Sequence, residues 1–339
     1  MFTTATFTDD IYSRDPTTVQ LETEMAALTG HESALFVVSG TMGNQLSLRT
    51  HLSQPPHSVL CDESSHIFVH EAGGLAMFSQ AQMNTIKPKN GRHITLEEVK
   101  AGIVPDDDDH YAPTMVVSME NTLNGMVMPY VEAKRISEFI REEYKGKIKL
   151  HLDGTTSLNL LMEGARLWNG VVAEKISIKQ YCSLFDSVSL CFSKGMSTPV
   201  GSVIVGSSAF VKKARHFKKA FGGGIRNPGI LTSACLTSLK QIMPRIEATH
   251  IFARELATRI EGLGYRLTHP VETTMIWLNL DELGIPYKSF VDYCAREGVT
   301  VFDFNRIVIH HQTTQEAADK LITALTRLME DVKGGILQT

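Results

Sequence analysis

The sequence predicts an α/β protein built on a doubly wound, mostly parallel β-sheet, with a smaller α/β domain at the C-terminus. Short apolar runs alternate with amphipathic stretches through most of the 339 residues, a pattern typical of successive strand–helix–strand units. Several runs are apolar at consecutive positions, as expected for parallel strands covered on both faces. The pattern changes after about Ser238, so we expect a large domain over residues 1–238 and a small one over residues 239–339.

The expected strands of the large domain are short apolar runs that end in glycine or polar residues. They span residues 34–38, 58–61, 114–118, 148–152, 187–192 and 202–205. A helix is expected over residues 18–28, because Leu21, Met25 and Leu28 recur at helical spacing. Another helix is expected to begin at Thr95, because Glu98 three residues later completes a capping box.

The C-terminal domain is expected to combine long amphipathic helices with short apolar segments. The helices span residues 246–263, 289–297 and 314–332, and the strand-like segments span residues 274–280, 299–302 and 306–309. This order of elements predicts a small α/β domain.

Composition and charge exclude several classes of protein. With 33 basic and 37 acidic side chains the net charge is −4, whereas a nucleic-acid surface usually needs a concentrated basic face. The five cysteines form no CxxC pair, which favours a reducing compartment. No apolar run approaches the ~20 residues of a membrane span, and the first ten residues lack the basic start and apolar run of a signal peptide. We therefore expect a cytoplasmic protein that binds neither nucleic acid nor membrane.

Three candidate functional groups follow expected strands. Lys194 comes just after the apolar run 187–192, where desolvation favours a neutral amine able to attack an aldehyde. Asp153 follows the earlier apolar run 148–152. A carboxylate at the end of a strand can pair with the protonated pyridine nitrogen of pyridoxal phosphate. The segment Gly40–Thr41–Met42 opens a helix after a strand, so its N–H groups can hold a phosphate. Taken singly, the lysine could snorkel to solvent and the aspartate could cap a turn.

Together with their flanking motifs, these groups resemble the low-specificity threonine aldolase family. The resemblance covers nearly the whole chain in collinear order and rests on the segments DPTTVQLE (15–22), ALFVVSGTMGNQ (34–45), DESSHIFVHEAGG (62–74), SMENTLNG (118–125), HLDG (151–154), ARLWNG (165–170), DSVSLCFSKGMSTPVGSVIVG (186–206) and FGGGIRNPG (221–229). It implies a fold-type I enzyme with pyridoxal 5'-phosphate as cofactor and a small amino acid as substrate. The implied reaction cleaves the Cα–Cβ bond of β-hydroxy-α-amino acids such as threonine or allo-threonine, giving glycine and an aldehyde.

The resemblance also implies roles for residues that bind the cofactor. Lys194 would carry it as a Schiff base, Asp153 would pair with its pyridine nitrogen, and His66 would stack on its ring and serve in proton transfer. The phosphate would be bound by the helix start at Gly40 and by Arg226, the latter across a subunit boundary in a homodimer or homotetramer.

The remaining implied roles concern the substrate. Arg166 would contact the cofactor's 3′-oxygen or the substrate carboxylate, and Arg306 would be the other carboxylate ligand. His110 matches a histidine near the substrate hydroxyl, and Glu71 matches an acidic residue that orients the water or base network.

His66 and His70 are four residues apart, as zinc ligands on a helix are, but no third ligand follows at a suitable spacing, so no metal is expected.

Three features depart from the family pattern. The family's N-terminal segment before Asp9, with its carboxylate-binding serine, has no counterpart, and residues 155–164 interrupt what would otherwise read HLDG-ARLWNG. Leu123 and Thr274 stand where the family often has histidine and asparagine. The interruption is expected to pack as a helical turn or to disturb the pocket. Two alternatives therefore stay open beside the aldolase: an amino-acid racemase, since fungal alanine racemases resemble the same family, and a weakly active paralogue.

Overall fold

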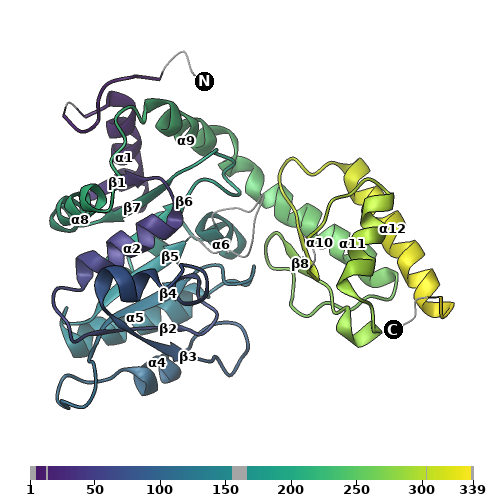
Figure 1. Cartoon of the computed structure of the whole chain (residues 1–339), viewed down its shortest axis with the longest axis horizontal. Coiled ribbons are helices and arrows are strands. Elements are labelled where there is room, and N and C mark those ends of the chain that lie inside the picture. The colour runs from purple at the N-terminus through teal and green to yellow at the C-terminus, as the bar shows by residue number, and fades with distance from the viewer. Residues whose placement is uncertain (1–4, 13, 155–165, 303, 337–339) are drawn as a thin grey trace. The chain divides into compact units, whose positions relative to one another are not determined.

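The computed structural model describes residues 5–12, 14–154, 166–302 and 304–336, with only the backbone at residue 166 (Figure 1). The interruption expected at residues 155–164 lies outside this part of the chain. The chain divides into two compact units, Met1–Leu123 with Val127–Pro244, and Asn124–Met126 with Arg245–Thr339. The boundary expected between residues 238 and 239 falls inside helix α9 (Gly229–Gln241), whereas this division follows that helix.

The first unit is built on a mixed sheet with the strand order β1-β7-β6-β5-β4-β2-β3. Its strands are β1 (Ser33–Val37), β2 (Ser58–Asp62), β3 (Gln82–Ile86), β4 (Thr114–Glu120), β5 (Lys149–Gly154), β6 (Ser187–Cys191) and β7 (Ser202–Gly206). β6, β5, β4, β2 and β3 run parallel, while β7 is antiparallel to both β6 and β1. Every residue of β2, β6 and β7 is buried. The predicted mostly parallel α/β fold is confirmed.

Helices connect these strands and cover the sheet. They are α1 (Pro16–Thr29), α2 (Gly40–His51), α3 (His66–Val69), α4 (Leu96–Gly102), α5 (Tyr130–Tyr144), α6 (Arg166–Glu174), α7 (Ile178–Cys182), α8 (Ser208–Ala220) and α9. The predicted capping box of Thr95 and Glu98 starts α4. The helix expected over residues 18–28 is α1, which begins earlier because Asp15 caps it and Pro16 occupies its first turn.

Helix α2 lies unusually close to the sheet. It packs against β5, β6 and β7, and a Cβ added to Gly43 would come within 2.6 Å of Ser189 Oγ on β6. A glycine is therefore required for the first turn of α2 to approach β6 this closely. The close approach brings the buried polar side chains of α2 against the carboxyl end of β5.

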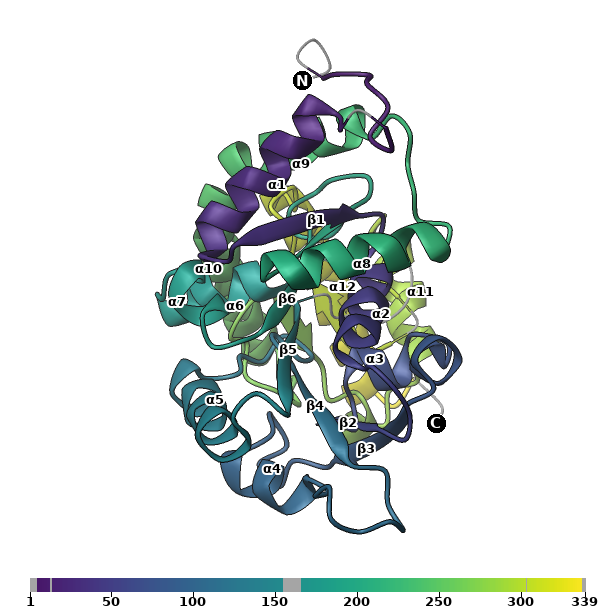
Figure 2. The same cartoon turned by 90° about the vertical axis from the view of Figure 1, so that its left-hand side faces the viewer.

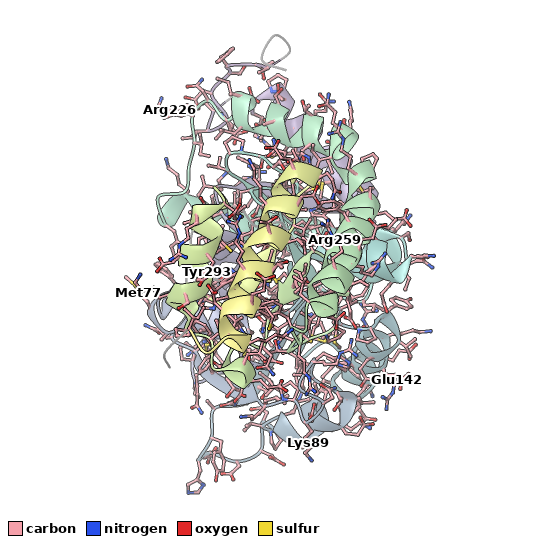
Figure 3. All side chains as sticks on the ribbon, turned by 90° about the vertical axis from the view of Figure 1, so that its right-hand side faces the viewer. Met77, Lys89, Glu142, Arg226, Arg259 and Tyr293 are labelled. Atoms are coloured by element: carbon pink, nitrogen blue, oxygen red, sulfur yellow. The ribbon has the colours of Figure 1, made fainter. Side chains whose placement is uncertain are left out.

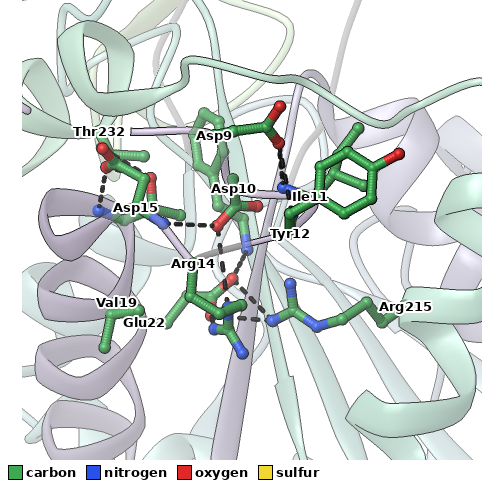
Figure 4. A network of polar contacts seen from close by, with 12 residues as sticks. Asp9, Asp10, Ile11, Tyr12, Arg14, Asp15, Val19, Glu22, Arg215 and Thr232 are labelled. Atoms are coloured by element: carbon green, nitrogen blue, oxygen red, sulfur yellow. Dashed lines mark hydrogen bonds and ion pairs between the residues drawn. The ribbon is translucent and has the colours of Figure 1, made fainter. Parts of the chain in front are cut away.

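The edge strand β1 is protected by charged side chains from two helices. Figure 2 shows β1 lying between α1 and α8. Glu22 of α1 accepts a hydrogen bond from the backbone N–H of Phe36 (3.0 Å), and Lys218 of α8 donates to the carbonyl of the same residue (2.9 Å). Arg14 and Arg215 pair with Glu22 at 2.6 and 2.9 Å (Figure 4). At Phe36, the outward-facing backbone groups of this edge strand are thereby satisfied within the chain.

We expect Glu22→Ala to destabilise the first unit by about 1–3 kcal/mol, because the buried N–H of Phe36 loses its acceptor. The midpoint of urea unfolding, followed by circular dichroism, measures this. The matched control is Glu24→Ala in the same helix, whose carboxylate contacts Gln20 near the surface and whose loss should change stability by less than about 0.5 kcal/mol. Equal midpoints for both variants would contradict the role given to Glu22.

The second unit has its own core and a two-stranded sheet. Strands β8 (Met275–Trp277) and β9 (Arg306–Val308) pair antiparallel. Helices α10 (Ile246–Gly262), α11 (Tyr287–Arg296) and α12 (Gln315–Lys333) share a hydrophobic core with them. Leu256, Ile276, Phe290 and Leu325 are among its buried core residues. The expected strand at residues 299–302 is wrong, because Val299 N–H bonds to the carbonyl of Cys294 and so closes the turn after α11.

Across the described ranges, which omit residues 155–165, no helix has both the length and the apolar character needed to cross a membrane.

Candidate active site

The candidate site lies at the carboxyl ends of the parallel strands. Asp153 is the penultimate residue of β5, and Glu120, the last residue of β4, is its partner in the register. His66 begins α3 shortly after the end of β2. Because the carboxyl ends of parallel strands meet at one edge of a sheet, ligands of such folds usually bind there. The topology therefore gathers residues from distant parts of the sequence at this edge.

Three predicted residues, His66, Glu71 and Asp153, form one buried cluster. Their potential ligand atoms all lie within 4.8 Å of one another. His66 Nδ1 is 2.6 Å from Glu71 Oε1 and 3.9 Å from Asp153 Oδ2. The backbone N–H of His66 also donates to Glu120 Oε2 at 2.7 Å, which fixes the start of α3 over β4. The structure thus brings together the predicted ring-stacking histidine and two carboxylates.

Two residues that sequence reasoning assigned no role, Asn44 and Gln45, tie this cluster to α2. Asn44 Nδ2 donates to Glu71 Oε1 and to Asp153 Oδ2, each at 2.8 Å. Gln45 Nε2 donates to the other carboxylate oxygen of Glu71. The sequence feature that could have indicated them is the pair of adjacent amide side chains in a helix expected to cover the sheet. Amides buried there need hydrogen-bonding partners.

Burial and neighbouring charges shift the pKa values of this cluster. Burial alone lowers the pKa of His66, but the hydrogen bond to Glu71 and the charges of Asp153, Glu71 and Glu120 outweigh it, so the pKa is raised. Burial raises the pKa of Glu71, and the contacts with His66 only partly offset this. The pair therefore holds a proton between an imidazole and a carboxylate more readily than the separate groups would in water.

We expect Glu71→Gln to lower the pKa of His66, because the substitution removes its strongest hydrogen-bond acceptor and one nearby negative charge. NMR titration of the His66 ring measures the shift, so wild type should keep the imidazolium form to higher pH than the variant. Glu63→Gln is the control, since Glu63 pairs with Lys87 instead. A His66 pKa that is the same in wild type and Glu71→Gln would contradict the coupling.

The same three side chains have the composition of a metal site, but their hydrogen bonds argue against one. The amide N–H₂ of Asn44 points at the two carboxylate oxygens that a cation would need. A donor at that place repels a cation, whereas it stabilises carboxylates. The cluster is better suited to an organic group that offers a proton to Asp153.

The start of α2 provides a candidate phosphate site next to this cluster. Ser39 caps the helix, and its Oγ accepts the N–H of Met42 at 3.1 Å. Gly40 and Thr41 precede that bond, and the first N–H groups of a helix have no acceptor within it. Thr41 is exposed, and the start of a helix is a place where an anion can bind.

Lys194 lies in the turn after β6, whose neighbour in the sheet is β5. Its side chain is half-buried, and its carbonyl accepts the N–H of Ser197 at 2.6 Å. Because β5 and β6 are parallel, Lys194 and Asp153 leave the sheet at the same edge.

Two predicted residues of the first unit lie elsewhere on its surface. His110 is exposed in the loop before β4, where its Nδ1 pairs with Asp108 at 2.8 Å. Arg226 pairs with Asp9 at 3.1 Å and lies over the ring of Tyr12, and Figure 3 shows it at the outside of the molecule. The structure does not bring either residue into the buried cluster of the same unit.

The two predicted substrate-binding arginines occupy different elements. Arg166 begins α6, and its side chain lies outside the described residues. Arg306 begins β9 in the second unit, where its buried guanidinium lies 5.3 Å from the centre of the Trp277 ring.

Comparison with known proteins shows the family and the fold of this chain. A model of the β-eliminating lyase family matches residues 1–283. The chain is 43% identical over 331 residues to the low-specificity L-threonine aldolase of Candida albicans, covering 97% of this chain and 85% of that protein. It is 35% identical over 325 residues to alanine racemase TOXG of Cochliobolus carbonum, covering 94% and 80%.

Solved structures show the same fold at low sequence identity. Threonine aldolase of Leishmania major superposes with a TM-score of 0.76 at 17% identity, covering 97% of this chain and 93% of that one. A variant of serine palmitoyltransferase from S. paucimobilis, solved with a bound pyridoxal phosphate–myriocin aldimine, superposes with a TM-score of 0.71 at 17% identity, covering 97% of this chain and 80% of that one.

The fold and the match to the β-eliminating lyase family define the class of this protein, a fold-type I lyase. Within that class, the chain belongs to the low-specificity threonine aldolase family. The resemblance inferred from the sequence motifs is confirmed.

Proposed function

We propose that this protein is a pyridoxal-phosphate-dependent aldolase that cleaves the Cα–Cβ bond of β-hydroxy-α-amino acids such as threonine or allo-threonine. The products are glycine and an aldehyde. The observation that carries the proposal is the buried cluster of His66, Glu71 and Asp153 at the sheet edge where Lys194 also emerges. Its support from relatives is the 43% identity to a low-specificity L-threonine aldolase.

The residues present fit the cofactor. Lys194 supplies a primary amine that can bond its aldehyde, Asp153 supplies a buried carboxylate for its pyridine nitrogen, and Gly40 and Thr41 supply N–H groups for its phosphate. When bound, pyridoxal phosphate withdraws electrons from Cα of an attached amino acid and so makes the bonds at that carbon labile.

The protein's own residues then orient the substrate and move protons. Because Nδ1 of His66 faces Glu71, we assign proton exchange with the β-hydroxyl to the opposite ring nitrogen, Nε2. Arg166 and Arg306 are the proposed ligands of the substrate carboxylate. By fixing the carboxylate, these arginines would set the orientation of the substrate, and so they would select the reaction as well as the substrate.

Alanine racemisation is the second candidate function. Its support is the 35% identity to alanine racemase TOXG. Racemisation breaks the Cα–H bond and needs no base for a β-hydroxyl, so the same cofactor site would serve it.

A single incubation series separates the candidates. Purified protein is supplied with L-threonine, L-allo-threonine and L-alanine, and glycine, acetaldehyde and D-alanine are measured. The proposal predicts glycine and acetaldehyde in equal amounts from at least one threonine isomer, dependent on added pyridoxal phosphate. Formation of D-alanine without aldehyde would show that the protein is a racemase and not an aldolase. No turnover of any substrate would indicate a weakly active paralogue.

We further propose that the protein is a cytoplasmic homodimer or homotetramer. All five cysteines are free and buried, which suits a reducing compartment. Arg226 is exposed on the loop between α8 and α9, from which it can reach the phosphate site of another subunit. Sedimentation should therefore show a stable oligomer, and a monomer that retains its full complement of cofactor would contradict the assembly.

A further inference from the structure

A chain of hydrogen bonds leads away from the candidate active site into the body of the sheet. Asn44 Oδ1 is 3.2 Å from His151 Nε2, and His151 Nδ1 is 2.9 Å from Ser187 Oγ. Ser187 Oγ is in turn 2.7 Å from His51 Nε2, at the end of α2. Asn44, His151 and Ser187 are fully buried.

The chemistry of the participants gives this chain a single direction. Ionised carboxylates only accept hydrogen bonds, so the N–H₂ of Asn44 must face Glu71 and Asp153 and its oxygen must face His151. His151 must then carry its ring proton on Nε2. Its Nδ1 consequently accepts from the hydroxyl of Ser187, which leaves the Ser187 oxygen to accept from His51.

Both histidines are suited to this arrangement because they are neutral. Burial lowers the pKa of His151 to about 3, although the charge of Asp153 opposes the shift. Burial also lowers the pKa of His51 to about 3, and the charges of Lys149 and Lys213 add to the effect. At neutral pH each ring therefore has one donor and one acceptor, as the chain requires.

We propose that Ser187 and His151 are positioning residues, which fix the Asn44 amide with its N–H₂ toward Asp153 and Glu71 and so preset the two carboxylates for the cofactor. The inference rests on the proposed function, because it assigns Asp153 to the pyridine nitrogen. It extends the site beyond the proposed cofactor ligands to β6 and to the end of α2.

The consequence of breaking the chain of hydrogen bonds follows from the two tautomers of the histidine ring. In a Ser187→Ala variant the two carboxylates still favour the Nε2–H tautomer through Asn44. Without the Ser187 hydroxyl, however, nothing holds Nδ1 as an acceptor, so a fraction of His151 carries its proton on Nδ1 and accepts at Nε2. The Asn44 amide can then turn over and present its oxygen to Asp153 and Glu71, and an oxygen there repels both carboxylates. Asp153 would be less well held, and cofactor affinity would fall.

The test compares Ser187→Ala with Ser189→Ala. Both serines lie on β6, two residues apart and hence on the same face, and both are fully buried. Ser189 Oγ has no hydrogen-bond partner among the described residues. Both substitutions therefore remove a buried hydroxyl group from the same face of β6, but only Ser187→Ala breaks the chain of hydrogen bonds.

Two readouts are measured on the full-length protein. The first is the dissociation constant of pyridoxal phosphate, obtained by titrating the cofactor-free form. The second is the ¹⁵N NMR spectrum of the His151 ring, assigned with His151→Gln, which reports the tautomer directly and which a purely structural role of Ser187 would not move.

We expect Ser187→Ala to bind the cofactor about fivefold to tenfold more weakly and to show a mixture of His151 tautomers. Ser189→Ala should match wild type in both readouts. Asn44→Asp, which replaces the donor by an acceptor at nearly constant size, should weaken binding further, by about a hundredfold.

Equal affinities of wild type and Ser187→Ala, or a His151 ring protonated on Nδ1 in wild type, would overturn the inference, as would equal weakening by Ser189→Ala. Wild type that binds the cofactor but cleaves no β-hydroxy-amino acid would overturn the proposed function alone. Wild type that does not bind pyridoxal phosphate would overturn both.

Discussion

Lys194→Ala should lose the yellow colour of the bound cofactor and lower aldol cleavage on the order of a thousandfold or more. The reason is that Lys194 is the amine placed after β6, at the edge where Asp153 and His66 lie. Without it, the cofactor would have no covalent link to the protein, and the substrate amine would have to react with the free aldehyde, which is slower. Absorption spectra and the rate of acetaldehyde release from threonine measure the two effects.

The control for this variant is Lys212→Ala, which removes an exposed lysine from α8. It should keep both the colour and the rate. A Lys194→Ala protein whose cofactor still becomes covalently attached on treatment with borohydride would show that another lysine carries it.

The second large effect is expected from Asp153→Asn. This substitution keeps the size of the side chain but removes the negative charge that stabilises a protonated pyridine nitrogen. Cleavage should fall on the order of a hundredfold, because the cofactor then withdraws electrons less effectively. Cofactor affinity should fall as well, and the two effects are separated by measuring the rate at saturating cofactor.

Asp186→Asn is the matched control for that experiment. Asp186 immediately precedes β6, where it accepts the N–H of Leu150 at 2.8 Å near the opposite end of the strands. An asparagine oxygen can accept the same bond, so stability and cleavage should stay near wild type. Equal loss of activity in both variants would mean that Asp153 has no special role.

Much of the architecture was predictable because buried parallel strands have a strong sequence signature. Every position of β2, β6 and β7 is buried. Consecutive apolar residues indicate this in β2 and β7, whereas β6 alternates serines with apolar residues. β3 (Gln82–Ile86) was missed for the opposite reason: it is an edge strand in which only Ile86 is buried. Val299–Phe302 has strand-like composition, but its first N–H is taken by the end of α11.

The site was predictable only in part. Asp153 directly follows one apolar run and Lys194 follows another after a single serine, and a strand end is a local feature that sequence shows. The hydrogen bond between Asn44 and Asp153 joins positions 109 residues apart, and only the packing of α2 against β5 creates it. The same holds for His151 and Ser187, whose partners lie on neighbouring strands and on α2. No local pattern contains such pairings.

We infer that this chain holds pyridoxal phosphate through Lys194 at the carboxyl ends of β5 and β6. The most direct measurement is reduction of the wild-type protein with borohydride, followed by proteolysis and mass spectrometry of the modified peptide. We expect one stoichiometric cofactor adduct, on the peptide that contains Lys194. An adduct on a different lysine, such as the buried Lys218 beside β1, or no adduct at all, would contradict it.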